Sequence, residues 1–207
     1  MHAALACALS GEENTDRRVW HQAMATLTGD EEVAAALEAS ARRAQLRAGH
    51  ASAATAFVRA AELSTDEARR AQRMAAAARA AWDAGQPDRA REIIGHVMPQ
   101  ATGQTRVNLL HLNGVIEGFA VNLRDAAASL SAAAAACTDP SRTIEMLFQA
   151  ADAAASSGDP AAVAELSSRA MRWTASSLPY SADSRGSMPG ITVWVKPCSP
   201  PRCAAPT

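Results

Sequence analysis

Alanine-rich runs, broken at regular intervals by glycine or asparagine, make up the first 175 residues of the chain. Their apolar positions follow a helical period, with polar residues between them. Alanine supplies about a quarter of the residues; it is the best helix former but fills little core volume. Val, Ile, Thr and Tyr are too sparse and scattered to form strands. The pattern therefore predicts an all-α protein whose helices pack closely through small faces.

The breaks recur with a nearly constant period. Helical runs end at Gly49, Gly85, Asn122 and Gly158, which are 36, 37 and 36 residues apart, and Gly11 lies 38 residues before Gly49. Glycine ends helices in the left-handed conformation, and asparagine is its usual substitute. A period of this length is typical of stacked structural repeats.

A second set of breaks divides each repeat into two helices. Thr28–Glu31 and Ser64–Glu67 each place a hydroxyl three residues before a glutamate and are predicted to be capping boxes. Residues 99–103 and 138–140 occupy the equivalent places in the next two repeats. The sequence thus predicts a TPR-like α-solenoid of antiparallel helical hairpins, with about four to five repeats of 36–38 residues. The expected helices are 2–9, 16–27, 30–48, 51–63, 66–84, 87–98, 104–120, 123–136, 140–156 and 160–174.

The composition changes at about residue 176. Six of the ten prolines lie beyond it, with serine and glycine between them, and no helical period continues. We predict two parts, a helical repeat domain at 1–175 and a disordered Pro/Ser-rich tail at 176–207. One hypothesis for the abrupt change is truncation or a shifted reading frame, which an alignment of all three frames of the encoding DNA would test.

Charge and composition limit the kinds of partner. The net charge is −1, so no overall basic field attracts nucleic acid or an anionic membrane. No apolar run approaches the ~18 residues of a membrane span, and residues 1–10 lack the basic start of a signal peptide. The four cysteines have no metal-site or redox spacing. We expect a cytoplasmic protein that contacts neither nucleic acid nor membrane.

Candidate catalytic chemistry is sparse. The five histidines are dispersed over different repeats. The sequence has no nucleophile elbow, no close carboxylate pair in an apolar setting and no GxxxxGK[ST] phosphate loop. The expectation is a non-enzyme without catalytic residues, cofactor or metal. We interpret Trp20 as filling a layer between helices, and the arginines of 17–18 and 42–43 as parts of ion-paired surfaces.

The spacing of small residues resembles the tetratricopeptide repeat, and three segments carry a more specific resemblance. Residues 16–23 (DRRVWHQA), residues 30–34 (DEEVA) and residues 49–64, which end in RAAELS, are together similar to the helical sensor region of large ATP-binding LuxR-type (MalT-like) transcriptional regulators. The similarity covers about residues 2–175. In that family an ATPase domain precedes the array and a helix-turn-helix domain follows it, but this chain carries the motif of neither. The resemblance implies an array that receives an inducer or a partner.

In the tetratricopeptide geometry the first helix of each hairpin lines a concave face. Offsets of −13, −10, −6, −3 and −2 from each break define that face here. A groove that is basic at one end and apolar at the other would suit a partner protein, a peptide or an amphipathic small-molecule inducer. The alternative is that the apolar members form core between repeats. The candidate binding residues are Arg43, Leu46, Arg47, Arg79, Trp82, Leu109, Leu112, Ile116, Phe119 and Phe148.

Three functional hypotheses follow. The leading one is a sensing or protein-interaction segment of a LuxR-type regulator, without its own ATP- or DNA-binding site, that shifts between states of the array. The second is a free-standing TPR-like adaptor that binds a partner peptide. The third is a truncated, non-functional remnant.

Overall fold

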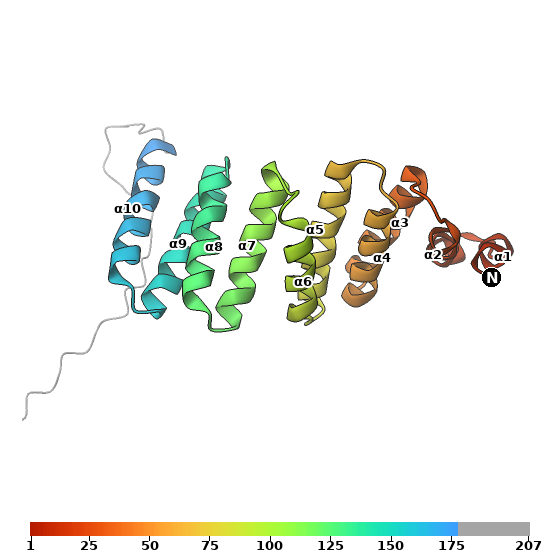
Figure 1. Cartoon of the computed structure of the whole chain (residues 1–207), viewed down its shortest axis with the longest axis horizontal. Helices are drawn as coiled ribbons and strands as arrows, with labels where there is room; N and C mark the ends of the chain where they lie inside the picture. Colours follow the sequence, from red (N-terminus) through yellow and green to blue (C-terminus); the bar gives the residue numbers. More distant parts are fainter. Residues whose placement is uncertain (178–207) are drawn as a thin grey trace, which may run out of the picture. The chain divides into compact units, whose positions relative to one another are not determined.

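The computed structural model describes residues 1–177, and this part of the chain consists of helices and short loops (Figure 1). The all-α prediction is confirmed, and every expected helix is found with its ends within three residues of the prediction. The predicted tail begins inside the last helix; its residues 178–207 lie outside the described part. None of the helices in residues 1–177 is long and apolar enough to cross a membrane. The elements are α1 (His2–Ala8), η1 (a 3-10 helix, Glu12–Asn14), α2 (Thr15–Ala25), α3 (Glu31–Leu46), α4 (His50–Glu62), α5 (Glu67–Asp83), α6 (Pro87–Val97), α7 (Gly103–Phe119), α8 (Leu123–Ala136), α9 (Pro140–Ser156) and α10 (Pro160–Ser177).

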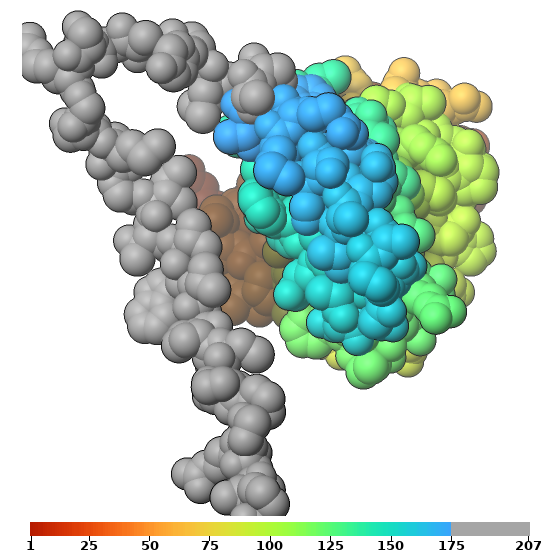
Figure 2. All heavy atoms as spheres, turned by 90° about the vertical axis from the view of Figure 1, so that its left-hand side faces the viewer, coloured from red at the N-terminus to blue at the C-terminus, as the bar shows by residue number. Residues whose placement is uncertain are grey.

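The helices pack as hairpins in the order of the sequence. α3 pairs with α4, α5 with α6, α7 with α8 and α9 with α10, while α1 and α2 form an N-terminal pair beside α3. The first helices α3, α5, α7 and α9 have 16 or 17 residues, and the second helices α4, α6 and α8 have 11–14. α10 forms the end of this array, and its outer surface faces the viewer in Figure 2.

The joint between the α5–α6 hairpin and the α7–α8 hairpin differs from the other joints. α7 contacts α5 and α6 much less extensively than α5 contacts α4 or α9 contacts α8 at the neighbouring joints. Leu109, Leu112 and Ile116 of α7 belong to the buried cluster of the preceding helices, whereas Val107 belongs to the cluster formed with α8, α9 and α10. α7 is therefore the helix that connects the two cores of the described chain.

All four hairpin turns end their first helix with the same hydrogen bonds. The amide after the left-handed residue donates to the carbonyl five residues back, as Asn122 does to Glu117 at 2.9 Å. This is the Schellman pattern, which satisfies the last carbonyls of a helix. Because each turn repeats it, the left-handed residues recur 37, 36 and 37 positions apart. They are Ala48, Gly85, Val121 and Gly158, with φ of 58°, 71°, 64° and 75°.

The predicted helix stops were right at two turns and one residue late at the other two. Gly49 has a φ of −81° and Asn122 a φ of −84°, so neither is the left-handed residue. Both are instead the N-cap residues of the following helices. Ala48 and Val121 adopt the left-handed conformation, which costs a non-glycine residue about 1–2 kcal/mol. The residue type misled the prediction, because the hydrogen bonds of the motif determine its position.

Aspartate caps three of the four long first helices. Asp30 and Asp66 accept hydrogen bonds from the amides three residues further on, at 3.0 and 2.7 Å, and Asp139 caps α9 in a similar way. The predicted capping boxes at Thr28–Glu31 and Ser64–Glu67 are therefore wrong. The aspartate is the last residue before the helix begins, where a side-chain oxygen reaches the free amides best.

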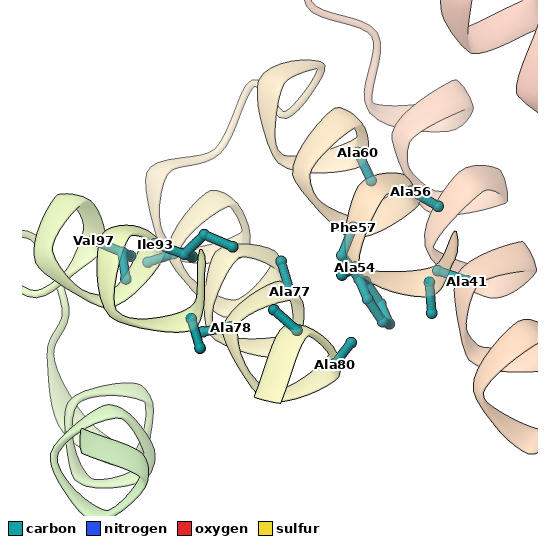
Figure 3. Close-up of a cluster of buried hydrophobic side chains, with 14 of the residues drawn as sticks. Ala41, Ala54, Ala56, Phe57, Ala60, Ala77, Ala78, Ala80, Ile93 and Val97 are labelled. Carbon is teal, nitrogen blue, oxygen red and sulfur yellow. The ribbon is translucent and has the colours of Figure 1, made fainter. Parts of the chain in front are cut away.

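The core is built largely from alanine, as predicted. Buried alanines of neighbouring helices lie close to one another around the larger side chain of Phe57, which is 1 % exposed (Figure 3). Trp20 packs partly buried against this cluster, in agreement with its interpretation as a filler between helices. At Gly114 the packing leaves no room even for a methyl group, since an added Cβ would lie 2.6 Å from Leu130 Cγ. Small residues thus allow the close approach of the helices.

A buried arginine of α5 connects this helix to α3. Arg73 is 3 % exposed; its Nε donates to Glu38 and its Nη2 to Glu31, both at 2.8 Å, and it also donates to the Ser64 hydroxyl. The hydrogen bond from Arg73 lowers the pKa of Glu31 to about 2. Burial alone would raise the pKa of Glu38, but hydrogen bonds from Arg42 and Arg73 outweigh it and lower that pKa. Both carboxylates are therefore charged at neutral pH. They lie two turns apart on α3, and each forms an ion pair with Arg73.

Val121→Gly should stabilise the protein. Valine is strained at a φ of 64°, and its side chain is 75 % exposed, so the change removes strain and little buried surface. We expect the free energy of unfolding, measured by urea denaturation, to rise by about 0.5–1 kcal/mol after the chain entropy of glycine is included. The control is Ala120→Gly, at a φ of −79°, which should lower stability. Destabilisation by Val121→Gly would contradict the left-handed assignment.

Arg73→Met should destabilise the protein by about 2–4 kcal/mol, because two shielded carboxylates lose their shared partner. The folded-state pKa of Glu31 is lowered, so the stability from this interaction is present above its ordinary pKa of 4.5 and is lost as the pH falls toward 2. Urea titrations should therefore show a smaller difference between wild type and Arg73→Met at about pH 3 than at about pH 6.

Arg69→Met provides the comparison for this experiment. Arg69 also pairs with Glu31, but its side chain is 59 % exposed, so its loss should cost less than about 1 kcal/mol. Equal losses for the two variants, or a loss for Arg73→Met that is the same at every pH, would contradict the role assigned to the buried arginine.

Candidate functional site

A polar cavity of about 320 Å³ lies between the first helices α5 and α7, next to the start of α9. Ala75, Ala76 and Leu112 provide its apolar part. None of the described residues that line it carries a carboxylate. We call this cavity the polar groove. Its polar side chains are Gln72, Arg79, Thr105, Asn108, His111 and Arg142.

Hydrogen bonds between α7 and α9 order one side of the polar groove. Arg142 Nη2 donates to Asn108 Oδ1 at 3.0 Å, and His111 Nε2 lies 3.0 Å from Gln149 Oε1. Both pairs join residues 34–38 positions apart in the sequence, close to one repeat. The side chains are therefore positioned by neighbouring repeats.

Two guanidinium groups give the polar groove its charge. Arg79 on α5 donates from Nε to Asp83 at 2.9 Å and remains 61 % exposed. Arg142 on α9 is half-buried and has no carboxylate partner among the residues that the structure describes. A guanidinium whose only hydrogen-bond partner is a neutral amide can still bind an anion.

A second cavity, of about 560 Å³, lies further along α7 and α9 and reaches α8. Gly114 and Gly118 line it on α7 together with Phe119, which is 77 % exposed. We call it the apolar cavity, although Gln149 and Asp152 also line it. Because Gln149 bonds to a residue of the polar groove, the two cavities are adjacent along the same pair of first helices.

Side chains of α5 and α6 each bridge the joint to α7. The rings of Trp82 and Phe119 meet edge to face, with centroids 5.1 Å apart and an angle of 71°. Arg91 Nε donates to Glu117 at 3.0 Å. Hydrogen bonds from Asn122 and Arg91 lower the pKa of Glu117, so this ion pair is formed at neutral pH. The structure thus brings together two predicted site residues, Trp82 and Phe119.

Arg43 and Arg47 lie elsewhere, at the boundary of α2 and α3. Both bind Asp16, with nitrogen–oxygen distances of 2.6 and 2.9 Å. Burial favours the protonated form of Asp16, but the two arginines outweigh it and lower its pKa. Arg47 lines a separate cavity of about 320 Å³ together with Trp20. The two arginines are therefore already paired, and they are not part of the polar groove.

Ile116 does not line a groove, which corrects its assignment as a binding residue. It is fully buried, and Leu109, predicted with it, is 1 % exposed. Leu112, also predicted with it, is 5 % exposed but contributes to the apolar lining of the polar groove. The error comes from counting offsets from Asn122 instead of Val121. A shift of one residue rotates a position by about 100° around a helix.

When the offsets are counted from the left-handed residues instead, the positions they select on the first helices agree with the residues that line the cavities. On α7 the offsets −13, −10 and −6 from Val121 select Asn108, His111 and Val115, all of which line one of the two cavities. Gln72 and Arg79 have the equivalent positions on α5. Phe148, at the equivalent of His111 on α9, is 62 % exposed. The sequence contained this signal, but Arg142 lies outside the offsets and could not be found in this way.

The histidines are less dispersed in space than in the sequence. His2 of α1 and His21 of α2 approach to 2.8 Å between their Nδ1 atoms, a contact that the sequence did not reveal. Within residues 1–177 no group of three or more His, Cys, Asp or Glu side chains could hold a metal ion.

Comparisons with known proteins support the fold. No protein-family model matches the chain, and no curated protein matches it. Among solved structures, the crystal structure of BtubC (BKLC) from P. vanneervenii is similar, with a TM-score of 0.64 and 14 % sequence identity. The match covers 87 % of this chain and 78 % of that chain. At this identity the similarity shows a shared helical fold alone.

Phe119→Ala and Ile116→Ala form a matched test of the corrected register. Phe119 is exposed, so its loss should lower the free energy of unfolding by only about 0.5–1.5 kcal/mol, mainly through its contact with Trp82. Ile116, three residues earlier and fully buried, should cost about 2–5 kcal/mol. Urea denaturation followed by circular dichroism measures both. A larger cost for Phe119→Ala would place Phe119 in the core and contradict the register.

Proposed function

We propose that this chain is a peptide- or protein-binding helical-repeat module whose binding surface is formed by the first helices α5, α7 and α9. The observation that carries the proposal is that the polar groove and the apolar cavity are adjacent on these helices. Their exposed side chains, such as Arg79 and Phe119, and the half-buried His111 are not members of the buried cores. A surface on which an apolar site and a polar site lie side by side is suited to binding an extended segment of a partner protein.

An amphipathic small-molecule inducer is the second candidate ligand. The observation that favours it is the size of the apolar cavity, because 560 Å³ lies within the range of about 300–1,000 Å³ typical of ligand pockets. A peptide fits the adjacent polar groove better, since several hydrogen-bonding side chains there come from three different helices.

We further propose that the module is the sensing segment of a cytoplasmic LuxR-type transcriptional regulator. The resemblance of residues 16–64 to the helical region of that family supports this proposal. In such a regulator the module would receive the signal, and other domains would bind ATP and DNA. Sequencing of the flanking DNA tests it: coding sequence for a P-loop ATPase on one side and a helix-turn-helix on the other is expected. Unrelated genes on both sides would favour a free-standing adaptor.

Affinity capture tests the binding surface. The full chain, immobilised, should retain a specific partner from a lysate of the encoding organism, identified by mass spectrometry. The double variant His111→Ala/Phe119→Ala should retain at least about fivefold less, because one substitution changes each cavity. Arg124→Ala is the control, since Arg124 is exposed on the second helix α8 and lines neither cavity.

Circular dichroism would first establish that all three proteins are equally helical. Equal recovery of the partner by the wild type, the double variant and Arg124→Ala would overturn the proposed surface. Loss of the partner with Arg124→Ala alone would move the site to the second helices.

A further inference from the structure

We infer that the segment bound in the polar groove is an acidic peptide. The inference rests on the proposed function and specifies the chemistry of the partner. It depends on the charges that surround this cavity and on how the neighbouring repeats hold them.

The polar groove has no carboxylate in its lining, unlike three other cavities of the described chain. Glu62 and Glu67 line the cavity between α4, α5 and α6, Asp16 lines the one beside Trp20, and Asp152 lines the apolar cavity. The polar groove combines two arginines and a histidine with neutral side chains. The cavity beside Trp20 also holds two arginines, Arg17 and Arg47, but there Asp16 lies among them, whereas no carboxylate of the described residues lines the polar groove. A segment with carboxylates complements it.

The nearby carboxylates do not neutralise both arginines. Asp83 accepts one hydrogen bond, from Nε of Arg79, and the Arg79 side chain remains 61 % exposed. Glu145 lies one turn from Arg142 on α9, but it accepts from Gln149 Nε2 at 3.2 Å. The guanidinium of Arg142 bonds only to Asn108 among the described residues. An incoming carboxylate could therefore receive hydrogen bonds from either guanidinium.

The groove also supplies neutral hydrogen-bonding groups between the two charges. Asn108 and His111 both lie on α7, between Arg79 on α5 and Arg142 on α9. Amide and imidazole groups in this place can bond to the main chain of an extended peptide while the arginines bind its side chains. At about 320 Å³, the cavity is near the lower end of the range of ligand pockets, which suits a short acidic stretch.

Selection from a random twelve-residue peptide library displayed on phage tests the inference, with the full chain as bait. The selected peptides should be enriched in Asp and Glu at least about threefold over the unselected library. Binding of a selected peptide, synthesised with a fluorescein label and measured by anisotropy, should weaken about fivefold in Arg79→Gln and in Arg142→Gln. Raising the salt concentration should weaken it further. Arg124→Gln removes the same charge from α8 and should bind as the wild type does.

The outcomes separate this inference from the proposed function. Selected peptides that are neutral or basic, or that bind Arg79→Gln and Arg142→Gln as tightly as the wild type, would overturn the acidic partner and leave peptide binding intact. Recovery of no peptide above the background of an unrelated helical protein would overturn both. An acidic peptide that Arg124→Gln weakens equally would show non-specific attraction to arginine and would also overturn the inference.

Discussion

Close contact between alanine faces is the constraint on which the rest of this structure depends. Alanine removes little apolar surface from water, so one hairpin cannot stabilise itself and must pack against neighbours on both sides. The Schellman turn recurs every 36 or 37 residues, so it reverses the chain at the equivalent position of each hairpin. Large side chains such as Arg79 and His111 have no room in these contacts and lie on the surface of the first helices.

Two exceptions to the alanine contacts determine how the repeats are joined. Arg73 replaces an apolar side chain between α3 and α5, and its ion pairs with Glu31 and Glu38 fix the register of these helices. At the next joint α7 has only limited contact with α5 and α6, and the polar groove lies there. The candidate site therefore occupies a place where the helices are less completely packed, which is also where side chains remain free to bind.

The sequence predicted the fold more reliably than the site. Alanine content and periodic breaks depend on local physics, and they were sufficient to locate every α-helix of residues 1–177 but not the 3-10 helix η1. The site required the rotation of each helix, and an error of one residue, from Val121 to Asn122, replaced His111 by Leu112 and Val115 by Ile116. Arg142 was out of reach for another reason: its position beside Asn108 depends on how α9 packs on α7.

The central claim is that partners bind across the first helices, and amide hydrogen exchange tests it most directly. Exchange should be followed by mass spectrometry in the full chain, with and without a saturating selected peptide. The account predicts that added protection is concentrated in α5, α7 and the start of α9, with α4, α6 and α8 unchanged. Protection confined to the second helices, or to α1 and α2, would contradict it.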